Sequence, residues 1–219
     1  MHVAAAGGGR VLVIGCGALA RELLAITASL PGVEVSCLPA DLHNRPGGIP
    51  AAVRERIHGA RGRYDRIFVA YADCGTGGLL DRVLSEEAVE RLPGAHCYEV
   101  YAGSAAFAHL ADEEPGTFYL TDFLVRNFER LVIRGLGLDR HPELLADYFG
   151  NYRRVVYLAQ TDAPELLAAA RHAVARLGLA FEHRPTGFGD LAASITAAAE
   201  TAASAAAAAA RETAALGVA

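Results

Sequence analysis

Two cysteines in this sequence follow short apolar segments of the kind that forms strands, and each stands beside glycine. Cys16 lies in "RVLVIGCGALARELLAI", and Cys74 lies in "DRIFVAYADCGTGGLLDRVLSE". A thiol between a strand and a helix can act as a nucleophile, because the positive end of the helix dipole stabilises the thiolate. It can equally act as a metal ligand, because thiolates bind zinc and other borderline metals. The position of both thiols therefore keeps two kinds of chemistry open.

Three further side chains extend the metal interpretation, because they too lie in loops or at the ends of predicted strands. His43 lies in the proline- and glycine-rich loop "LPADLHNRPGGIP", and His96 and Cys97 are adjacent in "HCYEVYAG". Three or four thiolate and imidazole ligands suffice for a zinc site. No Cys-x-x-Cys pair occurs, so the prediction rests on position at strand ends. The predicted cofactor is zinc, and the predicted ligands are Cys16, His43, Cys74, His96 and Cys97.

The segment "DCGTGG" around Cys74 allows further roles. Asp73 precedes the thiol and is a candidate general base or an outer partner of a metal ligand. Three glycines would let a small anionic substrate approach the backbone amides at the start of the following helix. The same glycines would also serve in a tight turn that packs strand and helix closely. The candidate substrate-binding glycines are Gly75, Gly77 and Gly78.

Two familiar motifs fit these segments only in part. "CGTGG" lacks the lysine of a Walker loop, and "GCGALA" has Ala20 where a dinucleotide fingerprint has its third glycine. We therefore expect no nucleotide cofactor. A nucleophile elbow has glycine on both sides of the nucleophile, whereas Cys74 has glycine on one side only. A metal-free cysteine hydrolase or transferase, with Cys74 as nucleophile and His43 or His96 as base, stays open as an alternative.

The elements that must position these residues repeat one order of strand, small-residue turn and helix. The predicted strands are Val11 to Ile14, Glu34 to Leu38, Ile67 to Tyr71, Tyr98 to Tyr101, Phe118 to Leu120 and Val155 to Leu158. Alternating strands and helices predict an α/β fold with a mainly parallel sheet, helices on both faces and Rossmann-like units. Ligands in such folds bind beyond the carboxyl ends of the strands, which is where both strand-end thiols fall.

Composition sets limits on the organisation of the chain. Its 219 residues are 53% hydrophobic, which is enough for a core, and we expect a single α/β domain over residues 10–191. Residues 1–9 are small and glycine-rich, so we expect a flexible N-terminus without the regions of a secretory signal. Residues 192–219 are almost entirely alanine, and we expect a helical or disordered tail there.

Charge and cysteine count limit the partners and the compartment. The net charge of −5 leaves no basic stripe for nucleic acid. No apolar run approaches the ~20 residues that span a membrane. We therefore expect a small-molecule substrate and neither nucleic acid nor membrane as partner. Four cysteines are too few for a disulfide framework, so we expect a reducing, cytoplasmic compartment with available thiols.

Several phrases carry a resemblance to a known family: "CGALARE", "LPADLHNRP", "YADCGTGG", "HCYEVYAG", "EPGTFYLTDFLVR" and "LDRHPELLADYFGNYRRVVYLAQT". Over Arg10 to Leu191 the chain resembles domain-of-unknown-function family 1638, found in bacteria and methanogenic archaea. Archaeal members keep the first cysteine, the "LHN" histidine, the Cys-Gly after the third strand, and a His and a Cys near "HCY". An acidic residue separates those last two in them, whereas His96 and Cys97 are adjacent here.

The resemblance implies a setting but no assigned activity. Family members are often encoded beside corrinoid-dependent methyltransferases for methylated amines, which suggests one-carbon metabolism and a corrinoid protein as partner. This setting agrees with a zinc site, because zinc turns a bound thiol into a thiolate that can accept a methyl group. By resemblance alone, Thr117 and Asp122 are candidate substrate contacts.

The leading hypothesis is a zinc enzyme that acts on a small amine or thiol compound. The reaction would be transfer of a methyl or similar group, or hydrolysis. A non-catalytic accessory protein, which holds a cofactor or a corrinoid partner, is an alternative beside the metal-free cysteine enzyme.

Overall fold

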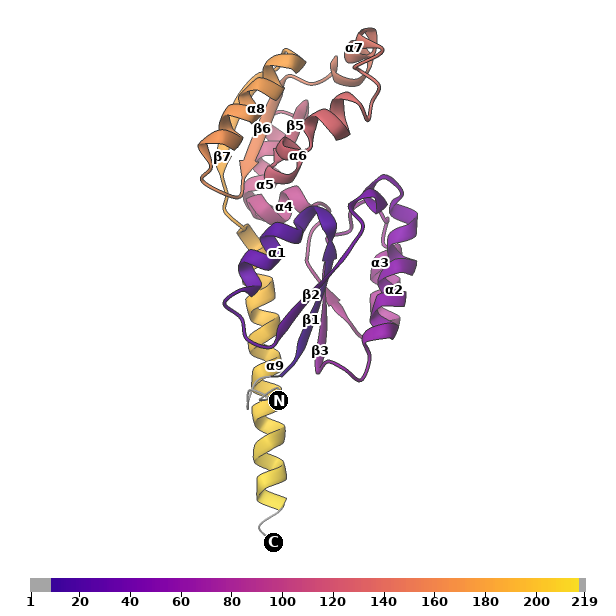
Figure 1. Ribbon diagram of the computed structural model, residues 1–219, viewed down its shortest axis with the longest axis vertical. Coiled ribbons are helices and arrows are strands. Elements are labelled where there is room, and N and C mark those ends of the chain that lie inside the picture. The colour runs from indigo at the N-terminus through magenta and orange to yellow at the C-terminus, as the bar shows by residue number, and fades with distance from the viewer. Residues whose placement is uncertain (1–8, 217–219) are drawn as a thin grey trace. The chain divides into compact units, whose positions relative to one another are not determined.

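The computed structural model describes residues 9–216, and the chain divides into two compact units (Figure 1). The first unit extends to Val100 and resumes at Asp190, and the second comprises Tyr101–Gly189. The sequence pattern predicts one domain over residues 10–191. Within that range the strands form two separate sheets, each covered by its own helices.

The first unit contains a four-stranded sheet in the order β2-β1-β3-β4, with every neighbouring pair parallel. Its strands are β1 (Val11–Cys16), β2 (Val33–Leu38), β3 (Arg66–Ala70) and β4 (Glu90–Arg91). β1 is buried along its whole length, as a central strand of a parallel sheet is. The sequence predicts the first three strands and misses β4, because two residues give no periodic signal.

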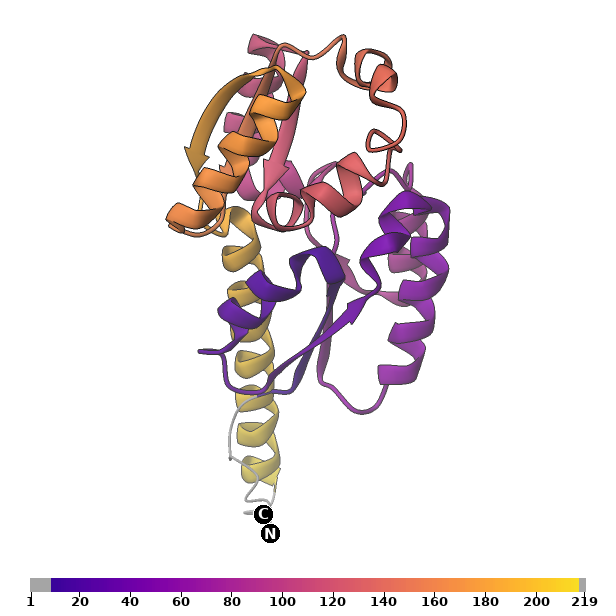
Figure 2. The ribbon, with the colours of Figure 1, turned by 45° about the horizontal axis from the view of Figure 1, so that its top comes forward.

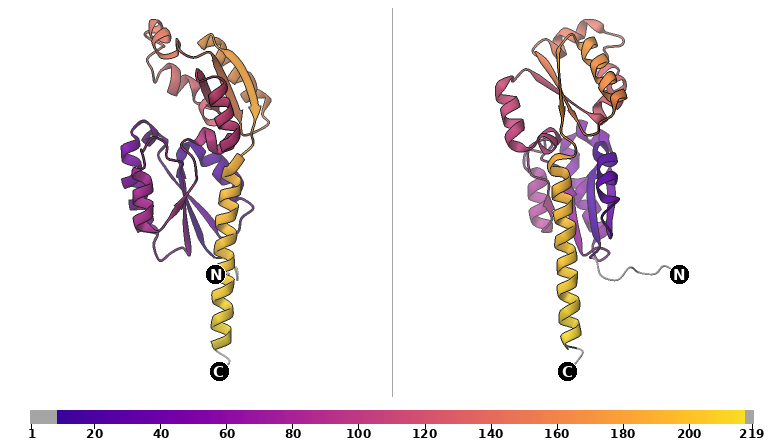
Figure 3. Two further views of the ribbon diagram at one scale, coloured as in Figure 1. Left: turned by 180° about the vertical axis from the view of Figure 1, so that it is seen from behind. Right: turned by 90° about the vertical axis from the view of Figure 1, so that its left-hand side faces the viewer.

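Helices cover both faces of this sheet, as the sequence predicts (Figures 1 and 3). α1 (Ala20–Thr27) and α9 (Gly189–Leu216) lie on one face, and α2 (Ile49–Ala60) and α3 (Leu79–Glu87) lie on the other. Short 3-10 helices at Gly17–Leu19, Ala40–Asn44 and Pro46–Gly48 follow β1 and β2. The parallel α/β prediction therefore holds for this unit.

Alternation along the strands assigns the cysteines of β1 and β2 to opposite faces. A Cβ at Gly15 would meet a leucine of α1, whereas Ser36 accepts a hydrogen bond from an arginine of α2. Gly15 is in register with Cys37, and Ile14 is in register with Ser36. Since side chains alternate along a strand, Cys16 projects from the face of α2 and α3, and Cys37 projects from the face of α1.

The alanine-rich tail forms α9, which packs on the first sheet through one buried stripe: Leu191, Ile195, Ala198 and Ala202. Small side chains allow a close approach, because a Cβ at Gly9 would stand 2.6 Å from the Ala202 carbonyl oxygen. Of the two expected alternatives, helix or disorder, the described part of the tail adopts the helix. Residues 1–8, expected to be flexible, and residues 217–219 lie outside the described residues.

α9 also corrects an expectation about membranes. Within residues 9–216, Gly189–Thr213 is one helix long and apolar enough to cross a membrane, by length and composition alone. The expectation that no segment approaches such a length is therefore wrong. The same alanine-rich composition also allows α9 to pack closely, because its buried stripe lies against the sheet of the first unit.

The second unit contains a three-stranded parallel sheet in the order β5-β6-β7 (Figure 2). Its strands are β5 (Thr117–Thr121), β6 (Arg154–Ala159) and β7 (Ala180–Pro185). Its helices are α5 (Ser104–Glu113), α6 (Asp122–Arg126), α7 (Leu145–Phe149) and α8 (Pro164–Leu177), with a π turn at Glu129–Ile133 and a 3-10 turn at Pro142–Leu144. α6 and α8 share one apolar core with the sheet. The polar edge strand β7 is missed by the sequence pattern, because it lacks an apolar run.

The segment Tyr98 to Tyr101, which the sequence predicts to be a strand, belongs to helix α4 (Cys97–Ala102). Its aromatic and β-branched residues favour a strand. The Glu99 carboxylate, however, accepts a hydrogen bond of 2.8 Å from the backbone amide of Ala95, two residues before the helix, and so joins the first turn of α4 to the loop that enters it. His96 and Cys97 therefore stand at the beginning of a helix and not at a strand end.

Candidate functional site

Three of the predicted ligands gather at the carboxyl edge of the first sheet. Cys16 ends β1, Cys74 lies in the turn after β3, and Cys97 begins α4. The charge of Cys16 acts on both other thiols, and the charge of Cys74 acts on Cys97. The fold therefore brings three thiols from distant parts of the sequence to one edge of the sheet, where their charges interact, as the charges of Cys16 and Cys37 also do.

A turn held together by Asp73 presents Cys74. The Asp73 carboxylate accepts a hydrogen bond of 2.6 Å from the Thr76 hydroxyl. It also accepts hydrogen bonds from the backbone amides of Gly77 and Gly78, at 3.1 and 2.9 Å. These bonds lower the pKa of Asp73 to about 2, so the carboxylate is ionised at neutral pH and is a weak base. The contacts of Asp73 thus give it a structural part in the turn.

The backbone of this turn explains its glycines. Gly75, Gly77 and Gly78 have φ angles of 81°, 60° and 80°, in the region that side chains disfavour. The amides of Gly77 and Gly78 already bond to Asp73, so an anionic substrate would have to displace that carboxylate. Cys74 itself has a φ of 50°, which costs about 1–3 kcal/mol for a residue with a side chain. Such strain is concentrated at functional sites.

Backbone hydrogen bonds tie this turn to the loop that leads to Cys97. The amide of Asp73 donates to the carbonyl of Gly94 at 3.1 Å. The amide of Cys74 donates to the carbonyl of Ala95 at 2.9 Å. Two successive bonds of this kind fix the separation of the two segments, and they place the turn next to the start of α4. This connection explains why Cys74 and Cys97 come together although 22 residues separate them in the chain.

Tyr71 stands beside the Cys16 thiol. Cys16 is 8% exposed and Tyr71 is 2% exposed. The two side chains interact, but the Tyr71 hydroxyl makes no hydrogen bond of good geometry with any described residue. A buried hydroxyl without a partner costs about 1–3 kcal/mol. Sequence reasoning missed Tyr71 as a site residue, although its position at the end of the predicted strand, three residues before Cys74, is a signal.

Burial raises the pKa of each clustered thiol. Burial and the neighbouring thiols raise the pKa of Cys74 to about 11 and that of Cys97 to about 12. Burial also raises the pKa of Cys16. The low pKa expected of a nucleophile at a helix N-terminus is therefore absent at Cys74, where Asp73 raises the pKa further. A cation between the thiols would have the opposite effect, because it stabilises thiolates.

The two predicted histidine ligands are solvent-accessible. His43 lies in the 3-10 helix after β2, and His96 directly precedes α4. Partial burial of its ring, and then the charge of His96, lower the pKa of His43. The neutral imidazole, which is the form that binds metals, is thereby favoured at His43. Both histidines are close enough to feel one another electrostatically.

The donor set has the composition of a zinc site, but the donors are not in ligand contact. Three thiols with one or two imidazoles are ligands that zinc prefers. Among residues 9–216, no three His, Cys, Asp or Glu side chains are grouped closely enough to hold a metal ion. The structure thus places the three thiols in one region of the first unit, and coordination itself is a matter for the proposal below.

The two residues implied by the family resemblance lie in the second unit, at opposite ends of β5. Thr117 begins the strand, and its hydroxyl donates to the Glu114 carbonyl at 2.6 Å. Asp122 follows the carboxyl end of the strand and is 0% exposed. The structure therefore does not bring Thr117 and Asp122 together.

Asp122 is the centre of a hydrogen-bond network between β5 and β6. Its carboxylate accepts bonds from the hydroxyls of Tyr157 and Thr161, at 2.7 and 2.5 Å. It also accepts one of 3.1 Å from the Gln160 amide, while the Gln160 side-chain oxygen accepts one of 2.7 Å from the Asp122 amide. Both carboxylate oxygens are occupied, so this network joins the ends of two strands.

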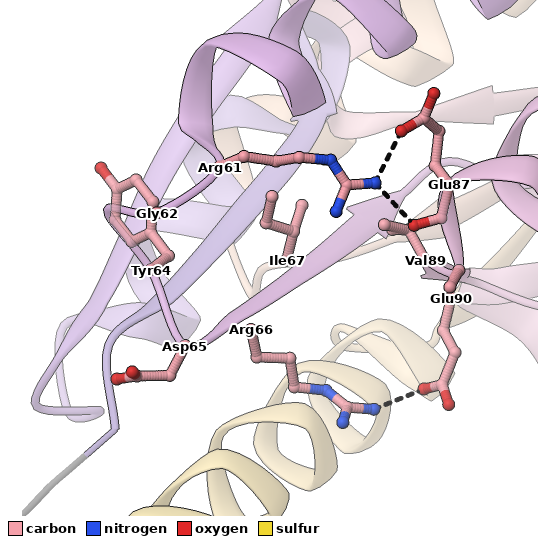
Figure 4. Close-up of a pocket in the computed structure, with 10 residues that line it drawn as sticks. Arg61, Gly62, Tyr64, Asp65, Arg66, Ile67, Glu87, Val89 and Glu90 are labelled. Atoms are coloured by element: carbon pink, nitrogen blue, oxygen red, sulfur yellow. Dashed lines mark hydrogen bonds and ion pairs between the residues drawn. The ribbon is translucent and has the colours of Figure 1, made fainter.

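A pocket of about 460 Å³ opens at the amino edge of the first sheet, the edge opposite the thiols (Figure 4). Arg61 donates to the carboxylate and carbonyl oxygens of Glu87, at 2.6 and 2.9 Å. Arg66 pairs with Glu90 at 2.6 Å. The two arginines of the lining are thus paired with its two glutamates, while Asp65 accepts a hydrogen bond of 2.6 Å from the backbone amide of Arg10, and none of the described lining residues is a cysteine or a histidine.

A family model described as Protein of unknown function (DUF1638) matches residues 37–195. The chain belongs to this family. The match covers most of the chain, including His43, Cys74, His96 and Cys97, and begins after Cys16. It confirms the family resemblance over residues 37–195, which contain every quoted phrase except "CGALARE". Among curated proteins and solved structures, no match to the chain was found.

Proposed function

We propose that this DUF1638 protein is a metal-binding enzyme that acts on a small amine or thiol compound. In this proposal Cys16, Cys74 and Cys97 bind zinc, and His43 or His96 completes the site. The convergence of three thiols at the carboxyl edge of a parallel sheet is the observation that supports the proposal most. Ligands bind at this edge in α/β folds of this type.

The electrostatics of the cluster favour a metal over a cysteine nucleophile. With a pKa of about 11, Cys74 is protonated at neutral pH, and a protonated thiol is a poor nucleophile. Its thiol neighbours oppose its ionisation as well. A divalent cation removes this opposition for all three thiols at once. The positive φ of Cys74 is a second support, because backbone strain at a ligand is typical of a built site.

Metal binding would draw the donors together from electrostatic range into contact. In this proposal the cysteine side chains would turn about their Cα–Cβ bonds, and the two accessible histidines lie before or within short turns. Zinc would supply a Lewis acid that lowers the pKa of a bound thiol or water. Tyr71 and the tied backbone of the Cys74 turn would keep the surrounding frame fixed.

For the reaction itself we propose transfer of a methyl or similar group, with a corrinoid protein as a candidate partner. The support is the family resemblance and the suitability of a thiol site for methyl acceptance. The test is a methyl-transfer assay with methylcobalamin and a thiol. If no methyl group is transferred, hydrolysis at the same site or a purely binding role for the same metal is favoured.

The test of the metal site is the zinc content of protein purified without added metal. We expect about one equivalent of zinc in the wild type, measured by plasma mass spectrometry. Cys16→Ala, Cys74→Ala and Cys97→Ala should each lose it. Cys37→Ala is the matched control, because its thiol projects from the other face of the sheet, and it should keep the zinc.

Two results would contradict the metal proposal. One is a wild type that holds no zinc even after reconstitution, together with rapid iodoacetamide labelling of Cys74 alone, which would favour the nucleophile. The other is equal zinc loss in Cys37→Ala and Cys74→Ala, which would mean that the thiols bind metal without a defined site.

A further inference from the structure

We propose that two copies of this chain associate through the outward face of α9, as an antiparallel pair of helices. The outward face is the one that carries Glu200, Ser204, Ala207 and Arg211. It takes no part in the proposed metal site, and the match to the family model ends before it, at residue 195. The proposal is therefore independent of the proposed function.

α9 continues past the surface that it covers. Among its described side chains, the last buried one is Ala202, whereas the helix extends to Leu216. Figures 1 and 3 show this end of α9 running beyond the strands of the first sheet. Of the most apolar 18-residue window of the helix, 22% is buried. Most of an apolar helix surface thus faces solvent, which is typical of an interaction surface.

The face that carries Glu200 points away from the sheet. Glu200 is two residues from both Ala198 and Ala202, whose side chains are buried. Two residues turn an α-helix by about 200°, so Glu200 lies nearly opposite the buried stripe. Arg211 follows eleven residues later, which is three full turns and about 20° more. The exposed side chains of Glu200 and Arg211 therefore project from the same face.

The charges on this face are complementary to those of a second copy. After its first turn, the charged residues of α9 are Glu200, Arg211 and Glu212. With a two-fold axis between Ala205 and Ala206, each Arg211 is level with the Glu200 of the other copy, because both residues are equally far from the axis. A parallel pair would place like charges side by side, which is unfavourable. The antiparallel pair is thus favoured and has an ion pair at each end.

Small side chains, among them Ser204 and Ala207, lie between the two charges on this face. They allow the axes of two helices to approach closely, and each copy would shield the alanines of the other from water. The contact is short, and interfaces below about 1,200 Å² are typical of transient complexes. We therefore expect a weak dimer that forms at high protein concentration.

A second copy fits this helix better than a lipid bilayer does, although α9 is long and apolar enough to cross one. Leu191 and Ile195 pack the first part of α9 on the sheet, so the whole helix is not free to insert. Glu200 and Arg211 would also have to enter the hydrocarbon, which is costly for charged side chains. In the dimer these two charges are paired.

The test is sedimentation equilibrium of the full chain from about 10 μM to about 1 mM, and we expect the wild type to pass from monomer to dimer. Glu200→Arg and Arg211→Glu each place like charges together at both ends of the contact, so each should weaken the dimer by about 10-fold. The double variant restores opposite charges and should regain wild-type association. Arg82→Glu on α3 is the matched control, because it makes the same change of charge on the other face of the sheet. It should associate as the wild type does.

Several results would overturn this dimer. One is a wild type that stays monomeric over the whole range, and another is a dimer that Arg211→Glu leaves unchanged. Weakened single variants without recovery in the double variant would mean that the two charges do not meet. Binding of the monomer to phosphatidylcholine vesicles would assign α9 to a membrane instead. None of these results changes the zinc content, which tests the proposed function separately.

Discussion

The carboxyl edges of the two sheets carry polar side chains in equivalent places but in different states. In the second unit, Asp122 is buried and both its oxygens accept hydrogen bonds. In the first unit, three thiols oppose the ionisation of one another, and the buried Tyr71 hydroxyl has no partner of good geometry. A buried polar network in which every hydrogen bond is formed needs no ligand to explain it. For the thiol edge, where no such network joins the described side chains, we propose a bound ligand.

Position in the fold alone therefore does not identify a site. Both edges are where ligands bind in open parallel sheets, and the sequence places candidate residues at both. Hydrogen-bond satisfaction separates them: Asp122 holds two strand ends together, whereas Cys16, Cys74 and Cys97 are the residues for which we propose a cation. The following experiments test this distinction, starting with the largest expected effect.

Asp122→Ala should destabilise the protein strongly. The substitution leaves the buried hydroxyl of Tyr157 and the amide of Gln160 without their acceptor, so we expect the free energy of unfolding to fall by about 3–5 kcal/mol. Urea denaturation measures the change. The exposed Asp112 of α5 supplies the control, since Asp112→Ala should stay within about 0.5 kcal/mol of the wild type. A loss below 1 kcal/mol at Asp122 (about the size of one ordinary hydrogen bond) would break the distinction between the two edges.

Alkylation of Cys74 in the metal-free protein should be slow. Its pKa rises from an ordinary value of 9.0 to about 11, which leaves about 100-fold less thiolate at pH 8 than in the unfolded chain. Because the folded state holds this proton more tightly, its stability should fall as the pH rises from 9 towards 11. Iodoacetamide labelling followed by mass spectrometry measures the rate. Labelling at the rate of the urea-unfolded chain would contradict the raised pKa, and labelling faster than that would show that Cys74 is an activated nucleophile.

Gly78→Ala should have the smallest effect. Gly78 has a φ of 80° and precedes α3, so a side chain there adds backbone strain of about 1 kcal/mol. Gly47 has open space around it and no positive φ, and Gly47→Ala is the matched control. Thermal unfolding with zinc analysis measures both. If Gly78→Ala removed zinc without loss of stability, the glycine would belong to the site and not only to the turn.

The sequence predicted the parts of this protein that local patterns encode. β-branched and apolar runs identified β1, β2, β3, β5 and β6, and thiols after strands identified the edge where Cys16 and Cys74 meet. Residues whose surroundings come from distant segments were harder. α4 begins where Glu99 bonds back to the amide of Ala95, and the stripe of α9 depends on a sheet that begins far away in the sequence.

The candidate site shows the same limit. Residue type and position at strand ends identified the thiols as candidate site residues. The structural role of Asp73 became clear only from its bonds to Thr76, Gly77 and Gly78. Tyr71 was missed because a tyrosine in an apolar strand is usually packing, and its unpaired hydroxyl is visible only in three dimensions. The division into two units depends on which strands pair, and no local pattern contains that information.

The most direct test of the central claim is X-ray absorption at the zinc edge of the zinc-loaded protein. We expect a ligand shell dominated by sulfur at about 2.3 Å with a nitrogen contribution at about 2.0–2.1 Å, from Cys16, Cys74, Cys97 and one histidine. Cys37→Ala should leave this shell unchanged. A shell of nitrogen and oxygen alone would contradict the account, because zinc would then bind away from the thiol edge.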